Sequence, residues 1–490
     1  MKPNQFLGWS AALCLSAMTL NAQQTNEVEA LRQQLREATE NFEKVLRQHR
    51  ELMDHLTKKI EGLDQKQPAE TNRAEIVQQA PPAPASRPTP SAEPASAVPA
   101  LAQPSWSPSQ PLTVARAGSA YMNISFDALL DFGGSTDPDV SQRLNLGDHD
   151  PQQRGFSLRN AEIALDGAVD PYFKGFANIV FKLDGDQNTG VELEEAYLQT
   201  ASLPANLQLK AGQFFANFGR QNPQHPHQWA FVDQPVVLSR ALGPEGLRNL
   251  GAQLSWLVPV PFYTETFLGF FNSQSGQAFS FRNPGEDISG TNRFSGRETL
   301  SRGLRGPGDF LYVPRIASSF ELTDQQTLVV GASGAFAPNS TGPHTHSQIY
   351  GADAYWKWKP ANATEGFPFV SLQTEALFRR FEAGKDTTAL LPPETLRDWG
   401  FYSQVLWGFK PHWVTGLRGE YATGNPGAYD SMDVFRGRRT RLSPVLTWYP
   451  SEFSKVRLQY NYDTGQRIDD AHSVWLQLEF LLGAHGAHKF

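Results

Sequence analysis

The sequence predicts an all-β transmembrane barrel of about 16 antiparallel strands, preceded by an α-helical coiled coil and a proline-rich linker. Three observations lead to this fold class. The 490-residue chain is 11% aromatic and only 19% charged, which suits a chain of short strands. Its long C-terminal part alternates apolar and polar residues with a period of two. The connections between these runs are alternately short and long, as in outer-membrane barrels.

The first segment, residues 1–22, has the features of a cleaved secretory signal peptide. Lys2 supplies a positive charge, residues 6–20 form an apolar run, and Ala22 offers a small residue at the cleavage position. The run is too short to cross a bilayer as a helix. The single cysteine, Cys14, lies inside this segment. The mature chain is therefore expected to have no disulfide, no thiol catalysis and no Cys-ligated zinc.

Residues 23–66 show the apolar repeat of a coiled coil. Apolar residues recur in alternating steps of three and four, from Val28 to Leu56, with His49 as the one polar position of the seam. A lone amphipathic helix lying on another surface is the alternative, but a single helix could not bury this seam in water. We expect self-association, with a trimer as the favoured number.

Residues 67–112 form a Pro/Ala-rich linker. The stretch 79–112 holds 10 of the 35 prolines, and its only charged residues are Arg87 and Glu93. Such a stretch cannot build a core, and we expect an extended polyproline II tether between the coiled coil and the barrel.

Residues 113–490 are expected to form the outer-membrane β-barrel. The clearest strand is 456–463, where Val456, Leu458 and Tyr460 alternate with polar residues. In a soluble sandwich this alternation points apolar residues inward, whereas in a membrane barrel they face lipid. Turn residues divide the region into sixteen expected strands. These cover residues 119–132, 154–169, 171–184, 190–200, 205–216, 246–257, 261–272, 309–322, 325–338, 347–359, 366–383, 397–410, 412–424, 437–449, 453–463 and 470–482.

The connections favour the membrane barrel over the sandwich. Short turns, as at 170–171 and 410–411, alternate with long loops, as at 217–245 and 273–308. Short turns at one rim and long loops at the other are typical of outer-membrane barrels. Aromatic residues near the strand ends suit interfacial girdles. An even strand number puts both barrel ends at the short-turn rim. We therefore expect the outer membrane of a Gram-negative bacterium, with the coiled coil in the periplasm.

Several motifs carry a resemblance to known barrels. The segments Arg154-Gly-Phe-Ser-Leu-Arg-Asn, Glu194-Glu-Ala-Tyr-Leu and Leu247-Arg-Asn-Leu-Gly resemble strands of the phosphate-selective porin (porin O/P) family. This resemblance implies a sixteen-stranded trimeric porin with a constricting third loop. It covers residues 119–275 most clearly and the remainder by architecture.

A second resemblance points elsewhere. Asn222-Pro-Gln-His-Pro-His and Gly246-Leu-Arg-Asn-Leu-Gly are similar to outer-membrane proteins labelled zinc-regulated receptors, a label that implies TonB-type uptake. The sequence opposes that mechanism, because a plugged transporter barrel has about 22 strands. This chain has no room for those strands together with a plug domain.

The loop at 217–245 is the candidate constriction of the pore. It is too long for a plain connector, and its apolar residues argue for packing inside the barrel. An external lid or a trimer latch is the alternative. Its candidate site residues are Arg220, His225, His227, Asp233 and Arg240.

The expected lumen carries both signs of charge, so an unbroken ladder for anions is not evident. A ring of one sign at the constriction can still set selectivity. The lumen candidates on the strands are Lys174, Lys182, Lys210, Arg418, Glu420, Arg441 and Arg457.

Two His-x-His pairs make metal binding the alternative function. The pairs His225/His227 and His344/His346 can each present two imidazoles to Zn²⁺ or Cu²⁺. Loop histidines are mostly solvated, however, and no carboxylate partner is fixed by the spacing. Metal-related uptake or binding therefore ranks below the porin hypothesis.

The main hypothesis is an outer-membrane porin for passive diffusion of small hydrophilic solutes or ions. A third hypothesis makes the barrel an anchor for a coiled coil that tethers the envelope, in contact with the cell wall. Enzyme motifs such as G-x-S-x-G, the P-loop and H-E-x-x-H are absent from the sequence, so we expect no enzyme and no cofactor. A formal charge of −7 leaves no basic footprint for nucleic acid. The expected partners are outer-membrane lipid, a homotrimer and the solute.

Overall fold

The computed structural model describes residues 111–184, 188–201, 203–283, 293–301, 303–429 and 436–483. The expected signal peptide, the coiled coil and nearly all of the linker lie outside the described residues. Within the described part of the chain, no helix has the length and apolar character needed to cross a membrane.

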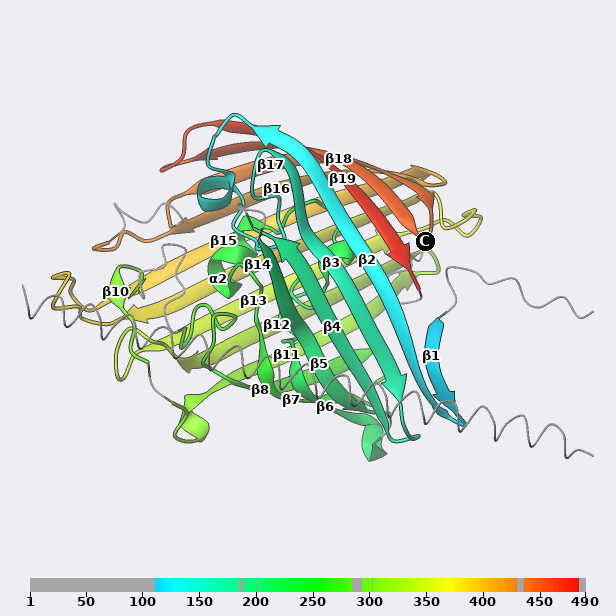
Figure 1. The fold of residues 1–490 in the computed structure, drawn as a ribbon, viewed down its shortest axis with the longest axis horizontal. Helices are drawn as coiled ribbons and strands as arrows, with labels where there is room; N and C mark the ends of the chain where they lie inside the picture. The colour runs from blue at the N-terminus through cyan, green and yellow to red at the C-terminus, as the bar shows by residue number, and fades with distance from the viewer. Residues whose placement is uncertain are drawn as a thin grey trace, which may run out of the picture. The chain divides into compact units, whose positions relative to one another are not determined.

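Sixteen antiparallel strands form a closed barrel (Figure 1). Each strand pairs with its neighbours in the chain, β8 pairs with β11, and β19 pairs with β2 to close the ring. The predicted sixteen-stranded barrel is confirmed, and each expected strand overlaps an observed one. The barrel strands are β2 Ala120–Ser135, β3 Gly155–Ala168, β4 Phe173–Leu183, β5 Thr189–Thr200, β6 Leu207–Phe215, β7 Arg248–Leu257, β8 Thr264–Asn272, β11 Phe310–Thr323, β12 Gln326–Pro338, β13 His346–Trp358, β14 Phe369–Ala383, β15 Glu394–Lys410, β16 Trp413–Gly424, β17 Arg439–Ser451, β18 Ser454–Gly465 and β19 Ala471–Leu482.

Several shorter elements lie outside the ring of sixteen. One of them, the strand β1, lies where the linker was expected to end and was not predicted. The pairing of β19 with β2 ends at Phe126, so the first residues of β2 have a free edge there. Strand β1 pairs with β2 along this edge (Figure 1). The short elements are β1 Leu112–Ala117, η1 Val140–Leu144, η2 Pro204–Asn206, η3 Pro226–Gln228, α2 Val236–Leu242, β9 Arg293–Phe294, β10 Arg297–Glu298 and η4 Pro307–Asp309.

The barrel is polar inside and apolar outside. On β18, Arg457 is 1% exposed and Asn461 0%, whereas Leu458 is 49% exposed and Tyr460 36%. The same alternation recurs on the neighbouring strands β17 and β19. A soluble sandwich would show the opposite polarity. Burying charges inside while exposing leucines outside is the pattern of a transmembrane barrel in lipid.

Aromatic side chains mark both borders of the apolar band. Near the short-turn rim, Trp407 packs on Phe409, and Trp413 stacks on Trp448. Near the long-loop rim, Trp399 packs on a tyrosine of β16. Trp399 and Trp407 lie eight residues apart on one strand, or about 27 Å at ~3.4 Å per residue. After a strand tilt of ~35–45° this corresponds to about 20 Å along the membrane normal, somewhat less than the apolar band of roughly 25 Å in outer-membrane barrels.

The interior also has an apolar core, where the loop 216–247 packs against the wall. Helix α2 lies against β14, β15 and β16. Gly400 on β15 has no side chain, and Val237 packs in the space this leaves. Gly351 on β13 makes room for Phe218 in the same way. The core therefore holds this loop inside the barrel, as the sequence predicted. Its other members include Phe214, Leu238, Leu242, Phe271, Leu311, Ile349, Leu377 and Tyr402.

Candidate functional site in the barrel lumen

The residues 216–247, named here the constriction loop, leave the wall between β6 and β7. Asn222 closes the loop at its neck. Its Nδ2 donates to the carbonyl oxygens of Ala216 (2.9 Å) and Leu247 (3.0 Å), and its Oδ1 accepts from the Leu247 N–H (2.7 Å). Asn222 is 4% exposed. The two ends of the loop are thereby held together, and the residues between them project as one unit into the lumen.

The first turn of the loop is fixed to β14. The Glu375 carboxylate accepts the backbone N–H groups of Arg220 (3.1 Å) and Gln221 (2.8 Å), and also the Tyr402 hydroxyl (2.6 Å). The Arg220 guanidinium lies over the Tyr355 ring, 3.9 Å from its centroid. Arg220 itself stays partly accessible to water. The sequence predicted that Arg220 lies at the constriction. It did not reveal that Glu375 holds the first turn of the constriction loop.

The centre of the loop is held by arginines of β16 and β17, through Asp233. Arg418 Nη2 donates to one Asp233 oxygen, and Arg441 Nη1 donates to the other at 2.6 Å. Gln459 and Asn461 of β18 donate to the same carboxylate at 2.8 and 2.9 Å. Asp233 is 0% exposed. Burial raises its pKa, but the two arginines lower it, and the net effect brings the pKa of Asp233 to about 2.

The same sector of the wall also binds the loop backbone. Arg457 donates to the carbonyl oxygens of Trp229 (2.7 Å) and Phe231 (3.0 Å). Glu420 accepts the N–H of Val236 at 2.7 Å, at the start of α2. The predicted lumen residues Arg418, Glu420, Arg441 and Arg457 thus come together, and the structure uses them to hold the loop.

The other predicted loop residues divide between two sectors. Arg240 lies at the end of α2, where its side chain donates to the Gly437 carbonyl oxygen (2.9 Å) and its own carbonyl oxygen accepts from Arg379 (2.9 Å). His225 and His227 lie across the lumen, on the β2–β5 side. Both are buried, at 5% and 2% exposed.

Four carboxylates surround this His-x-His pair, in a group named here the histidine–carboxylate cluster. His225 Nδ1 lies 2.8 Å from Glu194 Oε2, and His225 Nε2 lies 2.9 Å from Glu195 Oε2. His227 Nδ1 lies 2.8 Å from Asp127 Oδ2. The fourth carboxylate is Glu162, whose Oε2 lies 3.7 Å from His225 Nδ1 and 3.6 Å from His227 Nδ1.

Amides and a third histidine complete this cluster. Asn178 Nδ2 donates to Glu162 Oε2 (3.0 Å) and to Glu194 Oε2 (2.7 Å). His149, from the loop between β2 and β3, has its Nε2 3.4 Å from Glu194 Oε1. Asn160 on β3 donates to Glu162 at 2.7 Å. Four strands and two loops therefore converge on this point.

The carboxylates strongly favour the charged form of these histidines. Burial by itself would lower the pKa of His225, but Glu194 and Glu162 raise it well above its usual value. For His227, burial again opposes the charge, but Asp127 and Glu162 raise its pKa to about 10. These carboxylates therefore favour the positively charged form of both imidazoles.

A second charged group lies next to the cluster and is balanced internally. Lys182 forms ion pairs with Asp148, with Glu192 (2.9 Å) and with Glu245 (2.7 Å). Arg248 adds further ion pairs to Glu192 and Glu245, and Arg159 pairs with Asp148 at 2.8 Å, so three basic side chains balance three acids. The predicted lumen residue Lys182 therefore neutralises acids from a strand and two loops.

The remaining predicted residues are not brought into these groups. Lys174 is exposed near the short-turn rim of β4. Lys210 has its ammonium over the Tyr197 ring, 4.3 Å from the centroid. His344 and His346 lie at the long-loop rim, where the His346 side chain is 54% exposed and pairs with Glu382 at 3.6 Å. Among the described residues, the groups with metal-type ligands include neither His344 nor His346.

Sequence reasoning missed most partners of the His-x-His pair. Glu194 and Glu195 are neighbours in the chain, so a regular strand would point one of them at lipid. The register of β5 shifts at this position, with Glu195 opposite Asn178 and Leu193 opposite Ile179, which leaves Glu194 as an extra residue. This bulge lets both carboxylates point inward. Two adjacent glutamates in an otherwise alternating strand were the available signal.

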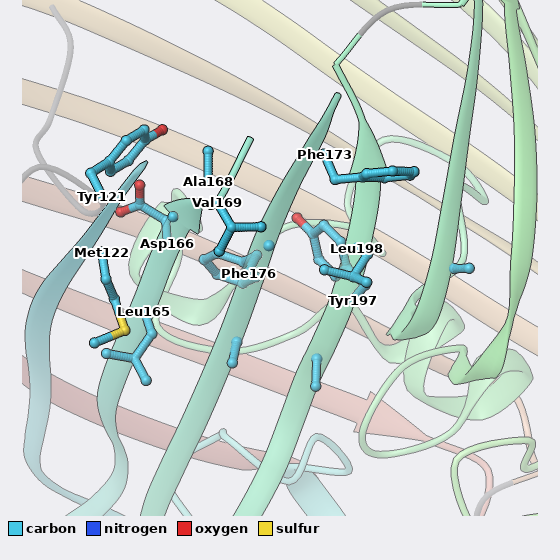
Figure 2. A pocket seen from close by; sticks show the side chains of 15 residues that line it. Tyr121, Met122, Leu165, Asp166, Ala168, Val169, Phe173, Phe176, Tyr197 and Leu198 are labelled. Atoms are coloured by element: carbon cyan, nitrogen blue, oxygen red, sulfur yellow. The ribbon is translucent and has the colours of Figure 1, made fainter. Parts of the chain in front are cut away.

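A groove of about 500 Å³ lies over β2–β6 near the short-turn rim (Figure 2). Its walls include Met122, Leu165, Phe173 and Leu198, which are apolar. Met122, Phe173 and Leu198 are among the exposed large apolar side chains of the outer surface. Phe176 and Tyr197 also line the groove, and the Phe176 ring centroid lies 6.4 Å from that of His225, so the groove borders the histidine–carboxylate cluster.

No protein-family model matches the chain. An uncharacterised protein of Aquifex aeolicus (strain VF5) is 33% identical over 356 residues, which cover 69% of this chain and 71% of that protein. The chain belongs to the family of this Aquifex aeolicus protein. The resemblances to phosphate-selective porins and to zinc-regulated receptors both stay predictions.

Three outer-membrane proteins are among the solved structures that are similar to this chain. The DcaP channel of Acinetobacter baumannii has a TM-score of 0.46 and 12% identity, over 74% of this chain and 98% of DcaP. The anion-selective porin from Comamonas acidovorans has a TM-score of 0.46 and 6% identity, over 74% and 100%. The trimer form of Vibrio cholerae OmpT has a TM-score of 0.45 and 7% identity, over 74% and 99%. Similarity at this level transfers no function to this chain.

Proposed function

We propose that this protein is an outer-membrane porin that passes small hydrophilic solutes or ions through a barrel narrowed by the constriction loop. The observation that carries the proposal is the inverted polarity of a closed sixteen-stranded barrel. Barrels of this size have an interior wide enough for an aqueous channel. The constriction loop then limits the width of that channel from within.

The water-accessible part of the lumen favours anions. Lys210, Arg220 and Lys357 point inward and remain partly accessible. Among the described residues, none of the three has an ion pair within 4.0 Å, whereas Arg418 and Arg441 do. Unpaired basic groups along a pore select for anions. We therefore infer a preference for anions, set by these three side chains rather than by the arginines that hold Asp233.

Single-channel recording of the full-length protein in a planar bilayer tests this proposal. A KCl gradient should give stable conductance steps and a reversal potential of the sign expected for anion preference. Arg220→Glu should shift the reversal potential toward cation preference, because it places a negative charge at the constriction. A matched control is Arg154→Glu, which changes an exposed arginine of the loop after β2. A folded protein that gives no conductance would contradict the porin proposal.

We also propose a homotrimer, with the coiled coil on the periplasmic side. The apolar groove of Figure 2 supports this assembly, because a neighbouring subunit can cover such a surface as well as lipid can. Native mass spectrometry in detergent would give the oligomer number directly. Conductance steps in groups of three are the expected electrical signature, and uniform single steps would contradict the trimer.

A further inference from the structure

The histidine–carboxylate cluster has a charge that its own side chains do not balance. Its four carboxylates, Asp127, Glu162, Glu194 and Glu195, are each less than 9% exposed. Among the described residues, every ion pair of these carboxylates within 4.0 Å is with a histidine, and none is with lysine or arginine. The adjacent group around Lys182 contrasts with this, because three basic side chains, Lys182, Arg248 and Arg159, pair with its three acids, Asp148, Glu192 and Glu245.

With all four carboxylates ionised, three neutral histidines leave the cluster with a net charge of −4, and three protonated ones leave −1. Burying uncompensated charge costs several kcal/mol per ion in proteins. A divalent cation removes this deficit and also lets the imidazoles bind as neutral ligands.

The ligand atoms are arranged as donors around an ion. One ligand atom from each of His225, Glu194 and Glu162 lies within 4.8 Å of the other two, and the same holds for His227, Asp127 and Glu162. Ligand bonds of ~2.0–2.2 Å in a tetrahedral site place donor atoms about 3.4 Å apart. The observed distances from His225 Nδ1 to Glu194 and Glu162 are 2.8 and 3.7 Å, which bracket this value.

Buried oxygen atoms at the same place have no hydrogen bond. Glu194 Oε1 and Asn178 Oδ1 are buried and make no hydrogen bond with a described residue, although His149 Nε2 lies 3.4 Å from Glu194 Oε1. Both residues are 0% exposed. Buried polar atoms normally have a partner. A cation bound by both oxygens of the Glu194 carboxylate supplies a partner for Oε1, and this observation is independent of the charge count.

From these contacts we propose that the histidine–carboxylate cluster binds a divalent transition-metal ion of the Zn²⁺ type, with His225, Glu194 and Glu162 as ligands. Imidazole combined with carboxylate suits zinc and its neighbours, whereas calcium and magnesium prefer oxygen alone. His227 and Asp127 provide a second pair of ligands beside the first, with Glu162 common to both. Asn178 donates to the carboxylates of both glutamates and so holds them in place.

Bound metal would connect the constriction loop to the wall. His225 belongs to the loop, whereas Glu162 and Glu194 belong to β3 and β5. An ion shared between them adds its binding free energy to the attachment of the loop. The site goes beyond the porin function, because it can hold metal whether or not the barrel conducts.

Calorimetric titration of ZnCl₂ into the metal-stripped, untagged, full-length protein in detergent tests the site. We expect saturable binding that weakens at least about 100-fold in Glu194→Gln, which keeps the shape of the side chain. Visible absorption of Co²⁺ would report nitrogen and oxygen ligands in the wild type and lose intensity in the variant. The heat-induced shift in gel mobility would show that each variant forms a barrel.

The chain offers a matched control in its other His-x-His pair. His344→Ala with His346→Ala removes two exposed imidazoles and should leave Zn²⁺ affinity unchanged, whereas His225→Ala with His227→Ala should abolish it. Equal affinity in Glu194→Gln and wild type, or loss only in the His344/His346 variant, would overturn the proposal. Conductance is measured separately, so failure of the porin function would leave this result interpretable.

Discussion

The interaction of Asp233 with Arg418 and Arg441 gives a quantitative prediction. Asp233→Ala removes the acceptor for four side-chain donors, all on β16, β17 and β18. Breaking a buried ion pair from one side costs about 3–5 kcal/mol. Each arginine keeps a second carboxylate, Glu420 or Asp463 at 2.8 Å, so the lower end of this range applies. We therefore expect a loss of about 3 kcal/mol in the attachment of the constriction loop.

A loss of this size changes the opening equilibrium of the loop roughly 100-fold, since 1.4 kcal/mol corresponds to a factor of ten. Trypsin gives a direct assay, because it cleaves after Arg240, which lies in the loop and is 5% exposed. Cleavage follows the population of the open loop when opening is fast relative to proteolysis. We expect cleavage after Arg240 to accelerate about 100-fold in Asp233→Ala. Mass spectrometry of the fragments would identify the bond.

Conductance provides the second measurement and Asp469→Ala the control. Asp469 is an exposed aspartate at the long-loop rim, and its removal should change neither the cleavage rate nor the conductance. Asp233→Ala should increase single-channel conductance, because a released loop widens the pore. Wild-type rates of cleavage after Arg240 combined with wild-type conductance in Asp233→Ala would refute the view that this carboxylate holds the loop.

Three further predictions follow from particular contacts. Burial raises the pKa of Asp233, but arginines bring it from 3.8 to about 2. Its stabilisation, about 2 kcal/mol, is therefore present above pH 4 and lost as the pH falls through 2. Wild-type conductance should rise at pH 2, and Asp233→Asn should lack this step. Gly219 has a φ of +62°, and a Cβ added there would meet the Glu375 carboxylate. Gly219→Ala should therefore loosen the neck of the constriction loop and speed tryptic cleavage after Arg240. Unchanged cleavage would contradict the role of Glu375 in holding the first turn of the loop. Leu458→Arg should lower the free energy of unfolding of the barrel by roughly 2–4 kcal/mol, measured by urea unfolding in vesicles. The control Leu458→Met should change it little. Equal stability of the two variants would argue that Leu458 does not face lipid.

The barrel could be predicted because its strands read clearly in the sequence. Every second residue faces lipid and is mostly apolar, so alternation over nine or more residues marks each strand. Strand starts were less exact where proline intervenes. The strand expected at 261 begins at Thr264, and the one expected at 366 begins at Phe369, directly after Pro368. Proline lacks the N–H that a ladder needs.

Strand β1 was missed for a different reason. Its six residues, Leu112–Ala117, pair only with β2 and are mostly exposed on both faces. Without one buried face there is no consistent alternation to read. The strand also directly follows the proline-rich stretch, whose composition dominated the interpretation.

The site could be predicted only as far as the loop itself. The length and apolar residues of the constriction loop indicated an inward fold, and its charged residues were proposed as lumen candidates. Their partners depend on which strands face each other across the lumen, and spacing in the chain does not encode this. Glu375 lies 155 residues from Arg220, and Arg441 lies 208 residues from Asp233.

The lumen carries charges of both signs. These charges show no order along the sequence, but in the structure they occupy separate sectors of the barrel wall. Carboxylates dominate the wall of β2–β5, arginines dominate that of β16–β18, and the constriction loop carries the complement of each. The loop places His225 and His227 toward the acids and Asp233 toward the arginines. A loop of one sign would be repelled by one of these two sectors. The order of charges along the loop therefore fixes its orientation across the pore, and exchanging Asp233 for a lysine should cost more than removing it.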